Sequence, residues 1–314
     1  MNKSLLFIGG SDIDYFYEVE NFPVAGDGCL SRFKGQKVGG CVVNAGCVAS
    51  SYGAAVRMLD TLKESDEGTE LIVSALREHG VDTSFIRYGK DVVNGNCLIM
   101  EHDGEKIIFV CQPSYPVYED DERLAELLGE ADYVYTLMHI VRSSFTDLKP
   151  LLKARQKGTR FIFDGSSQYN DPEEIEILKQ LASGLFINKT AYGRLCAKAG
   201  CDFKDYLLAH GAEFVCLTDG SRGAECHTAE GSWHCDSVKI QVKDSTGAGD
   251  TFAGSFLAFR QKGYDWPKCL SRASLAAAYA CTVEGGLGGC SNEKELIKWQ
   301  KKNLPDYVER VSAI

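Results

Sequence analysis

The sequence predicts an α/β fold in which helices cover both faces of a mainly parallel sheet. Three observations carry this prediction. From Leu124 onward, short apolar segments alternate with segments of helical periodicity, the pattern of a parallel sheet with crossover helices. Two earlier regions, at about 14–38 and 92–112, have the alternating pattern of hairpins and are expected to form an inserted small sheet. Near the end of the chain, glycines join a strand-like segment to a helix.

The first third of the chain opens with a buried strand. Residues 5–10 form a short apolar run that ends in glycines, which is typical of such a strand. Gly39 and Gly40 open a helix of small residues, and Gly80 ends a second helix with apolar residues at helical spacing. The expected elements are one-sided strands at 15–22 and 29–37 and helices at 43–52 and 68–79.

The remaining elements begin with a hairpin whose turn is His102-Asp103-Gly104, because Asp-Gly between two alternating runs favours a tight turn. Its strands are expected at 94–100 and 106–111. The alternating part then predicts strands at 133–137, 160–163, 185–187 and 214–217, with helices near 148–157, 173–182 and 191–199. After Gly223 we expect another hairpin, a strand at 238–242, helices at 251–262 and 275–281, a glycine-rich loop, and a charged helix from Glu293.

Composition excludes several classes of protein. The 314 residues carry a formal net charge of −10, which argues against a nucleic-acid partner. No apolar run reaches the roughly 18 residues that a membrane span needs, and the first ten residues have the pattern of a strand rather than of a signal peptide. The 13 cysteines include no CxxC pair, so we expect reduced thiols and a cytoplasmic protein. Without a repeat or linker, residues 1–314 are expected to form a single domain with the two insertions.

The clearest signal for chemistry is the glycine turn at residues 244–250, DSTGAGD. Gly247 and Gly249 allow a tight turn and a close approach to a ligand. The amides of Gly247, Ala248 and Gly249 would lie at a helix N-terminus, which favours an anion such as phosphate. Asp250, at the same helix start, is a candidate general base for a substrate hydroxyl. From the spacing alone, an ordinary helix-start aspartate fits equally well.

The wider segment DSTGAGDTFAGSF, residues 244–256, resembles the signature of the PfkB/ribokinase family of carbohydrate kinases. Residues 39–45, GGCVVNA, resemble the early glycine-asparagine signature of that family. Residues 11–14, SDID, resemble the substrate-contacting end of its first strand, and residues 215–223 resemble its nucleotide-side strand and loop. The resemblance covers nearly the whole chain. It implies a ribokinase-like three-layer αβα sandwich with a small β-sheet lid, formed by the two insertions.

The resemblance also implies a reaction, the ATP-dependent phosphorylation of a sugar-like substrate. Asp250 would accept the proton of the sugar hydroxyl, the three amides would stabilise charge on the transferring phosphate, and Mg²⁺ would bridge the ATP phosphates. The implied substrate contacts are Asp12, Asp14, Gly39, Gly40 and Asn44. The implied nucleotide contacts are Asn188, Thr218, Gly220, Gly223 and Ser274, and Asp244 with Thr246 would form a site for a monovalent cation such as K⁺. Ordinary turn and cap roles remain open for these residues.

The sequence departs from the family pattern in three places. Asn188-Lys189-Thr190-Ala191 lacks the glutamate that often follows this asparagine, so Lys189 either alters the phosphate contacts or is solvated. Cys41 replaces a lysine that ribokinases have, which argues against ribose as the substrate. Residues 164–167, DGSS, replace the DPNxR of many sugar kinases, so one arginine contact is missing.

Alternative functions remain open at this point. A nucleoside kinase would need an aromatic base pocket near the lid, for which Tyr15, Phe16 and Phe33 are candidates. A weakly catalytic sensor is a second alternative, suggested by Ala191, although such a protein has no need of Asp250. A zinc site at Cys226-His227 and His234-Cys235 is disfavoured, since adjacent strand residues face opposite sides. The lid sheet is a candidate surface for a homodimer.

Overall fold

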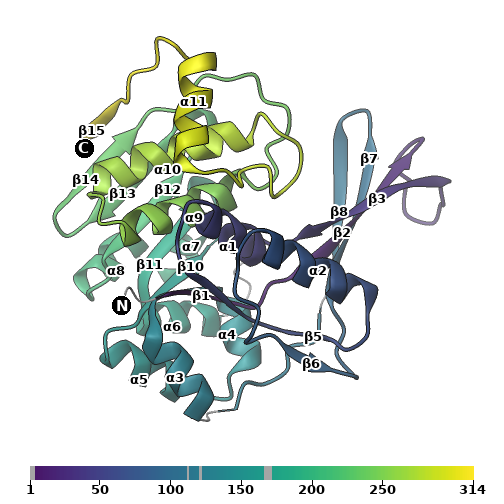
Figure 1. Ribbon diagram of the computed structural model, residues 1–314, viewed down its shortest axis with the longest axis horizontal. Coiled ribbons are helices and arrows are strands. Elements are labelled where there is room, and N and C mark those ends of the chain that lie inside the picture. Colours follow the sequence, from purple (N-terminus) through teal and green to yellow (C-terminus); the bar gives the residue numbers. More distant parts are fainter. Residues whose placement is uncertain (1–3, 112, 120–121, 166–171) are drawn as a thin grey trace.

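The structure is a computed structural model that describes residues 4–111, 113–119, 122–165 and 172–314 (Figure 1). The last residue of the second insertion, 112, and residues 166–167 of the DGSS segment lie outside the described residues. The body contains a nine-stranded sheet in the order β15-β14-β13-β12-β11-β10-β9-β1-β4. Its strands are Ser4–Ile8 (β1), Val56–Leu59 (β4), Ala131–Leu137 (β9), Arg160–Asp164 (β10), Ala182–Asn188 (β11), Phe214–Thr218 (β12), Ala224–Thr228 (β13), Gly231–Cys235 (β14) and Val311–Ala313 (β15).

The strands from β4 to β12 in this order run parallel, and β13, β14 and β15 continue the sheet antiparallel. The prediction of a mainly parallel sheet is therefore confirmed. Because the parallel strands share a direction, their carboxyl ends meet at one edge. In open α/β sheets this edge is where ligands bind.

Helices cover both faces of the sheet (Figure 1). One layer consists of Cys41–Ser51 (α1), Ala248–Gln261 (α9) and Trp266–Ala280 (α10), with Glu67–Glu78 (α2) and Glu293–Asn303 (α11) beside it. The other layer consists of Glu122–Glu130 (α3), Met138–Ser144 (α4), Lys149–Gln156 (α5), Pro172–Leu181 (α6), Lys189–Ala199 (α7) and Phe203–Ala209 (α8). None of the helices in the described part of the chain has the length and apolar character of a membrane span.

A separate four-stranded sheet forms the lid, in the order β3-β2-β7-β8, and projects away from the body (Figure 1). Its strands are Asp12–Val19 (β2), Ser31–Gly39 (β3), Gly95–His102 (β7) and Glu105–Cys111 (β8). This confirms the small sheet expected from the two insertions. Strand β2 starts four residues after β1 ends, and Gly9 and Gly10 make this turn with φ of 71° and 72°. A two-stranded sheet, Thr61–Lys63 (β5) with Arg87–Gly89 (β6), lies below α2 at the edge of the body in this view (Figure 1).

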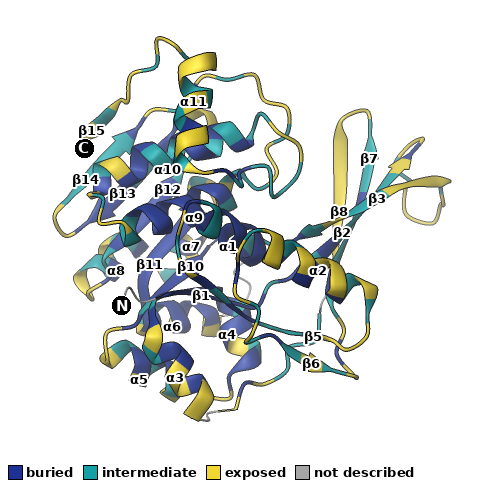
Figure 2. Ribbon diagram, viewed as in Figure 1, coloured by how far each residue is buried: buried dark blue, intermediate teal, exposed yellow. Residues whose placement is uncertain are grey.

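Helix α9 is deeply packed near the ligand edge. Every residue from Thr251 to Phe259 is buried, and the helix is among the darkest elements in Figure 2. The rings of Phe252 and Phe256 lie 6.0 and 5.4 Å from the ring of Phe186 in β11. Such aromatic packing fixes the helix against the sheet. The N-terminus of α9 is therefore held in one position relative to the strand ends.

Several predicted elements need correction. Residues 238–242 are not a strand, because the place beside β14 is taken by β15 from the far end of the chain. The alternation in this segment instead comes from Val238 and Ile240, which pack inward. Helix α9 begins at Ala248 rather than at 251, and α10 is twice as long as the expected 275–281. The short elements α4, α8, β4, β5, β6 and β15 were not expected.

Candidate active site

The glycine turn lies at the N-terminus of α9, as predicted. Gly247 is the N-cap of this helix, with a left-handed φ of 74°. A Cβ atom at this position would lie 2.3 Å from the carbonyl oxygen of Gly286, so only glycine fits. The Ala248 amide already donates to the Ser245 carbonyl oxygen at 3.3 Å. Among the three predicted amides, Ala248 is therefore the least suited to bind an anion.

Asp250 occupies the first turn of α9 and is hydrogen-bonded to Asn44 of α1. The Asn44 Nδ2 atom donates to Asp250 Oδ2 at 2.8 Å. Burial raises the pKa of Asp250 to about 7, and the nearby carboxylates of Asp164 and Asp14 add to the rise. The Asn44 hydrogen bond acts in the opposite direction. A carboxylate that titrates near neutral pH has the property required of a general base.

Close packing of α1 against α9 brings these two residues together. A Cβ atom on Gly254 would lie 2.2 Å from the carbonyl oxygen of Ala45, so the helix backbones touch at this point. Gly40, which precedes α1, has a φ of 94°, and a Cβ atom there would lie 2.0 Å from the Gly10 carbonyl oxygen. The predicted glycines therefore act through close backbone approach. They allow α1 to start directly beside the end of β1.

Asp12 and Asp14 lie on one face of β2, where this strand enters the lid. Two glycines on the neighbouring strands provide the space for their carboxylates. A Cβ atom at Gly39 in β3 would lie 2.4 Å from Asp14 Oδ2, and one at Gly95 in β7 would lie 1.8 Å from Asp12 Oδ1. Burial raises the pKa of Asp12 to about 6, followed in effect by the charges of Asp14 and Asp60. The structure thus places the predicted substrate residues at the base of the lid.

Three residues of this region were not assigned to the site from the sequence. Asp164 at the end of β10 is buried and accepts a hydrogen bond from the Tyr135 hydroxyl at 2.7 Å. Asp60 follows β4 and accepts hydrogen bonds from the Ser11 hydroxyl and the Thr61 amide. Burial raises the pKa of the Cys41 thiol well above its usual value, and the charges of Asp164, Asp250 and Asp12 act in the same direction. The position of Asp164 at a strand end was a usable signal, whereas Asp60 follows a strand that was not expected.

All of the predicted nucleotide contacts except Asn188 line a cavity of about 670 Å³ beside the glycine turn. Thr218, Gly220, Gly223 and Ser274 all contribute to its wall, together with Ala248 and Gly249. Its apolar side is formed by Val238, Ile240, Val242, Phe252, Ala277 and Ala278. The cavity therefore joins an apolar surface suited to a flat ring to the helix N-terminus suited to phosphate. The glycine-rich loop 285–289 lies elsewhere, against Asn44, Gly247 and Thr251.

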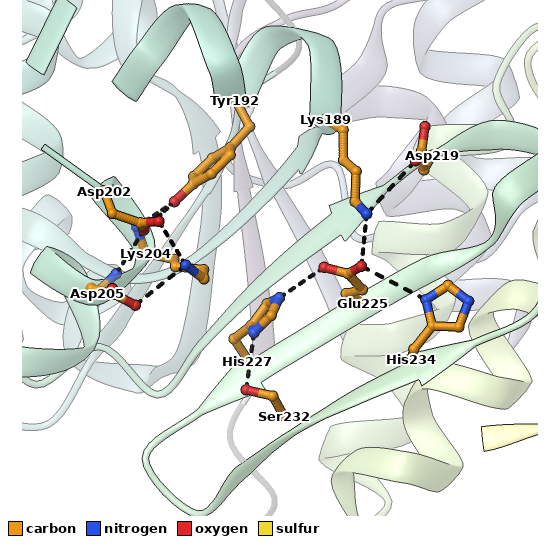
Figure 3. Close-up of polar contacts among 10 residues, drawn as sticks. All are labelled: Lys189, Tyr192, Asp202, Lys204, Asp205, Asp219, Glu225, His227, Ser232 and His234. Carbon is orange, nitrogen blue, oxygen red and sulfur yellow. Dashed lines mark hydrogen bonds and ion pairs between the residues drawn. The ribbon is translucent and has the colours of Figure 1, made fainter. Parts of the chain in front are cut away.

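Asn188 and Lys189 occupy the end of β11, next to Thr218. The Asn188 side chain caps α7 by accepting a hydrogen bond from the Ala191 amide at 2.8 Å. Figure 3 shows Lys189 directed at two carboxylates, Glu225 at 2.7 Å and Asp219 at 3.7 Å. Lys189 is therefore held in an ion-pair network, although its side chain stays partly exposed.

The same network holds the histidines of the Cys226-His227 and His234-Cys235 segments. His227 contacts Glu225 at 3.1 Å and the Ser232 hydroxyl at 2.9 Å, and His234 contacts Glu225 at 3.8 Å (Figure 3). In the register of this hairpin, Cys226 pairs with Trp233, and His227 pairs with Ser232. These histidines thus form part of a polar cluster that links β13 and β14 to the start of α7.

Asp244 and Thr246 are brought together with the glycine-rich loop. The Asp244 carboxylate accepts hydrogen bonds from the Thr246 amide at 3.0 Å, the Thr246 hydroxyl at 2.7 Å and the Gly285 amide at 2.9 Å. These donors hold the pKa of Asp244 below its usual value, although burial opposes them. The predicted cation-site residues are thus adjacent, and the turn and the late loop are joined through them.

The three lid aromatics do not form one pocket. Phe16 lies on the same face of β2 as Asp12 and Asp14, with the Lys37 ammonium 5.3 Å from its ring centre. Tyr15 lies on the opposite face and packs against the core. Phe33 packs against Tyr17 at 5.4 Å and is largely exposed. Only Phe16 therefore faces the candidate substrate residues.

Comparison with known proteins gives a consistent result. The family described as pfkB family carbohydrate kinase matches residues 2–294. The aminoimidazole riboside kinase of Salmonella typhimurium is 24% identical over 77% of this chain and 80% of its own length. Arabidopsis thaliana ribokinase, crystallised with ribose and ATP, superposes with a TM-score of 0.81 at 23% identity, over 96% of this chain and 99% of its own. An Escherichia coli protein crystallised with ATP and Mg²⁺ gives a TM-score of 0.78 at 20% identity, over 96% and 100%. These structures confirm the predicted fold.

Proposed function

Because this chain belongs to the pfkB family of carbohydrate kinases, we propose that it transfers a phosphoryl group from ATP to a hydroxyl of a small sugar or sugar derivative, with Asp250 as the general base. The observation that carries this proposal is the position of Asp250. Its carboxylate is hydrogen-bonded to Asn44 and lies within electrostatic reach of Asp14, and the residues directly before it, Ala248 and Gly249, line the cavity beside the glycine turn. Its pKa of about 7 suits it to take a proton from an alcohol.

The proposed reaction is an in-line transfer. Asp250 takes the proton of the acceptor hydroxyl as its oxygen attacks the terminal phosphorus of ATP, and ADP leaves with the electrons of the broken P–O bond. The amides of Gly247 and Gly249 at the α9 N-terminus support the negative charge on the transferring group. Asn44 holds the Asp250 carboxylate in place. Such a transfer depends mainly on positioning and on charge stabilisation, which rigid packing of α9 supports.

The cavity beside the glycine turn is the proposed ATP site. Its apolar wall, which includes Val238, Ile240, Ala277 and Ala278, suits the adenine ring. We expect Mg²⁺ to accompany ATP, because this cation binds chiefly to substrate phosphates and to one or two carboxylates. The buried Asp164 carboxylate close to Asp250 is an oxygen ligand of the required type. When bound, the ion neutralises phosphate charge.

A monovalent cation site at Asp244 and Thr246 remains part of the proposal. It is supported by the adjacency of these residues to the Gly285 amide, which links the glycine turn to the loop 285–289. A cation bound here would order both loops around Asp250. Replacing K⁺ by Li⁺ should then lower turnover in the wild type and have little effect in Asp244→Asn. Equal rates in both salts would exclude this role.

A nucleoside is the second candidate acceptor. It is favoured by Phe16, whose ring lies on the same face of β2 as Asp12 and Asp14 and could stack on a base. A weakly catalytic sensor is less well supported, since a binding protein has no need of a carboxylate with a pKa near 7. Phe16→Ala distinguishes the acceptors, because it should raise the KM of a nucleoside much more than that of a free sugar.

A homodimer through the lid is also proposed. Strand β8 is the edge of the lid sheet, and its apolar residues Ile108, Phe109 and Val110 are all exposed. A long apolar edge strand of this kind is suited to pair with a second chain. Light scattering should show a dimer that Val110→Lys dissociates, and a wild-type monomer at all concentrations would reject the proposal.

The 13 unpaired cysteines support the predicted cytoplasmic location, which detection of the protein in cell fractions would test.

The decisive experiment is an ADP-release assay with Mg-ATP against sugars, sugar derivatives and nucleosides, run with the wild type and with Asp250→Asn. Turnover of a compound by the wild type, lost in the variant, would support both the reaction and the base. Binding of ATP and of an acceptor without turnover would instead favour the sensor. Full activity of Asp250→Asn would reject Asp250 as the base.

A further inference from the structure

Lys37 of the lid reaches the body of the protein. This residue lies in β3 directly opposite Asp14 of β2, so the two side chains share one face of the lid sheet. The Lys37 ammonium lies 5.3 Å from the centre of the Phe16 ring on the same face. A Cβ atom on Gly285 would lie 3.5 Å from Lys37 Nζ and 3.6 Å from its Cδ atom. The end of this side chain therefore lies against the glycine-rich loop of the body.

The loop that Lys37 approaches also contacts the proposed catalytic groups. The carbonyl oxygen of Gly286 would lie 2.3 Å from a Cβ atom on Gly247, the N-cap of α9. A Cβ atom on Gly286 would lie 2.7 Å from Asn44 Nδ2, the atom that donates to Asp250. One loop thus lies against the glycine turn, the partner of the proposed base and the lid lysine. This places the Lys37 ammonium at the end of the site where ATP and the acceptor are proposed to meet.

The charge of Lys37 is available to a ligand. Lys34 in the same strand pairs with Glu18 at 3.8 Å, and Lys106 pairs with Glu101 at 3.2 Å. Lys37 forms no ion pair with any residue that the structure describes. It is exposed, and the flexible stem of a lysine allows its ammonium to adjust its position. An anion can therefore bind Lys37 without first breaking an ion pair.

Two arginines of the body have other contacts. The Arg142 guanidinium lies 4.0 Å from the Glu174 carboxylate, and the Arg87 guanidinium lies 5.3 Å from the centre of the Tyr118 ring. Both come from elements outside the lid sheet. The side-chain atoms nearest to a Cβ atom on Gly285 belong to Lys37. The cation that the fold places beside the glycine-rich loop is therefore a lid residue.

The proposed reaction requires a positive charge at this place. It brings the phosphates of ATP toward the carboxylates of Asp14 and Asp250, of which the first raises the pKa of the second. Burial raises the pKa of Asp14, whereas a hydrogen bond from Cys97 and the charges of Lys106 and Lys37 oppose that rise. A cation next to the transferring group offsets the repulsion between phosphate and carboxylate.

We propose that Lys37 is a catalytic residue that contacts the phosphoryl group during its transfer from ATP to the acceptor. The inference rests on the proposed kinase function and adds a lid residue to its machinery. The acceptor oxygen forms the new P–O bond, the bond to ADP breaks, and the acceptor proton goes to Asp250. The Lys37 ammonium keeps its protons and donates hydrogen bonds to the non-bridging oxygens of the moving group. It therefore acts through charge alone.

This role divides the stabilisation of the phosphoryl group between two parts of the protein. The amides of Gly247 and Gly249 act from the body, and Lys37 acts from the lid. A contact made chiefly in the transition state raises kcat and has little effect on the binding of either substrate. The expected signature of Lys37 is therefore a change in kcat rather than in KM.

Variants of Lys37 test this signature. Lys37→Met keeps an unbranched apolar side chain beside Phe16 and removes the charge. With Mg-ATP and the best acceptor among D-ribose, D-fructose and adenosine, its kcat should fall by about 10²-fold, the loss seen when one donor to a developing anion is removed. Lys37→Arg should recover much of this loss because it restores the charge. Lys34→Met, which removes a charge from the same strand, is the matched control and should retain the wild-type kcat.

A transition-state analogue distinguishes a catalytic contact from a structural one. MgADP with aluminium fluoride, in the presence of the same acceptor, mimics the transferring group. Its inhibition constant should rise in Lys37→Met by about the factor by which kcat falls, since both report the same interaction. The Kd of MgADP alone should stay at the wild-type value. A lysine that only supported the lid would not weaken binding of the analogue selectively.

The possible failures can be told apart. An unchanged kcat in Lys37→Met, or a raised acceptor KM at unchanged kcat, would overturn the catalytic role and leave the kinase function intact. An equal loss of kcat in Lys34→Met would overturn it as well, because the effect would then belong to the lid as a whole. Binding of Mg-ATP by the wild type without ADP release for any of the three acceptors would count against the kinase function itself, and the role of Lys37 would fall with it.

Discussion

The Asn44 side chain donates a hydrogen bond to the Asp250 carboxylate at 2.8 Å, although 206 residues separate the two positions. Asn44 lies in the early glycine-asparagine segment, and Asp250 lies in the late glycine turn. The hydrogen bond therefore joins the two segments that carry the family resemblance. It also fixes the orientation of the proposed base and lowers its pKa against the effect of burial.

Replacement of the proposed base should abolish most of the activity. Asp250→Asn retains the shape of the side chain and removes its basicity, so kcat should fall by about 10²–10⁴-fold. The Kd of ATP should change little, because the nucleotide cavity does not depend on this carboxylate. Steady-state kinetics and calorimetry check the two parts. Exposed Asp205→Asn is the matched control, and an equal loss in that variant would contradict the assignment.

Stability gives an independent measure of the same group. The pKa of Asp250 is higher in the folded state than the unfolded value of 3.8, so the folded protein binds more protons between these values. The ionised carboxylate therefore costs stability as the pH rises through about 7. Asp250→Asn should raise the Tm at pH 8 and have little effect at pH 4. An unchanged or lowered Tm at pH 8 would show that this carboxylate is not destabilised by burial.

The pH dependence of the wild type should follow the same titration. The ionised form of Asp250 is the active one, so kcat/KM should fall as the pH is lowered through about 7. Well below that midpoint the decrease should be about tenfold per pH unit. The measurement is kcat/KM from pH 5 to 9 at saturating ATP. A constant value down to about pH 5 would place the essential base elsewhere.

Loss of the Asn44 hydrogen bond should move this profile. Asn44→Leu has a similar volume and donates no hydrogen bond, so the pKa of Asp250 should rise and the acidic limb should shift to higher pH. The position of the midpoint is the relevant readout, because the overall rate also falls when a substrate contact is lost. Asn44→Ser is a useful comparison, since its shorter side chain retains a donor. A midpoint that stays in place would argue that Asn44 does not tune the base.

The space next to Asp12 should be essential for acceptor binding. A Cβ atom at Gly95 would lie 1.8 Å from Asp12 Oδ1 and 2.8 Å from the Ser11 carbonyl oxygen. Gly95→Ala should therefore displace the Asp12 carboxylate and raise the KM for the acceptor much more than the KM for ATP. Gly129→Ala, where a Cβ atom meets nothing within 4 Å, is the control and should behave as wild type. A change in both KM values alike would indicate general disruption.

The Lys189 network should act on stability. Lys189→Met leaves Glu225 and Asp219 without their shared cation. It should lower the free energy of unfolding by only about 1 kcal/mol, because Lys189 is partly exposed and its ion pairs are screened by solvent. In a Glu225→Gln background the same Lys189→Met change should lower the free energy of unfolding by less, because one of the two carboxylates paired with Lys189 is already gone. Urea unfolding of the two single variants and the double variant measures the coupling. Additive changes would show that the ion pair contributes nothing.

The parts of the site that could be predicted from the sequence are those encoded locally. The glycines and Asp250 lie within seven residues, so their shared helix start could be inferred from spacing. Asp60 could not be found in this way, because it joins the site only through the pairing of β4 with β1. The prediction of a strand at 238–242 was wrong for a similar reason. Its place in the sheet is taken by β15, whose pairing with β14 is not visible in local periodicity.

The contact between Gly254 and Ala45 has a consequence for the order of events during synthesis. The first fifty residues leave the ribosome long before α9 does, yet α1 finds its partner only when residues near 254 have emerged. Contacts of such large sequence separation form late in folding. During most of translation, the apolar face of α1 that packs against α9 in the folded protein therefore remains uncovered. We expect nascent chains that end before α9 to be recognised by chaperones and to gain protease resistance only once this helix is complete.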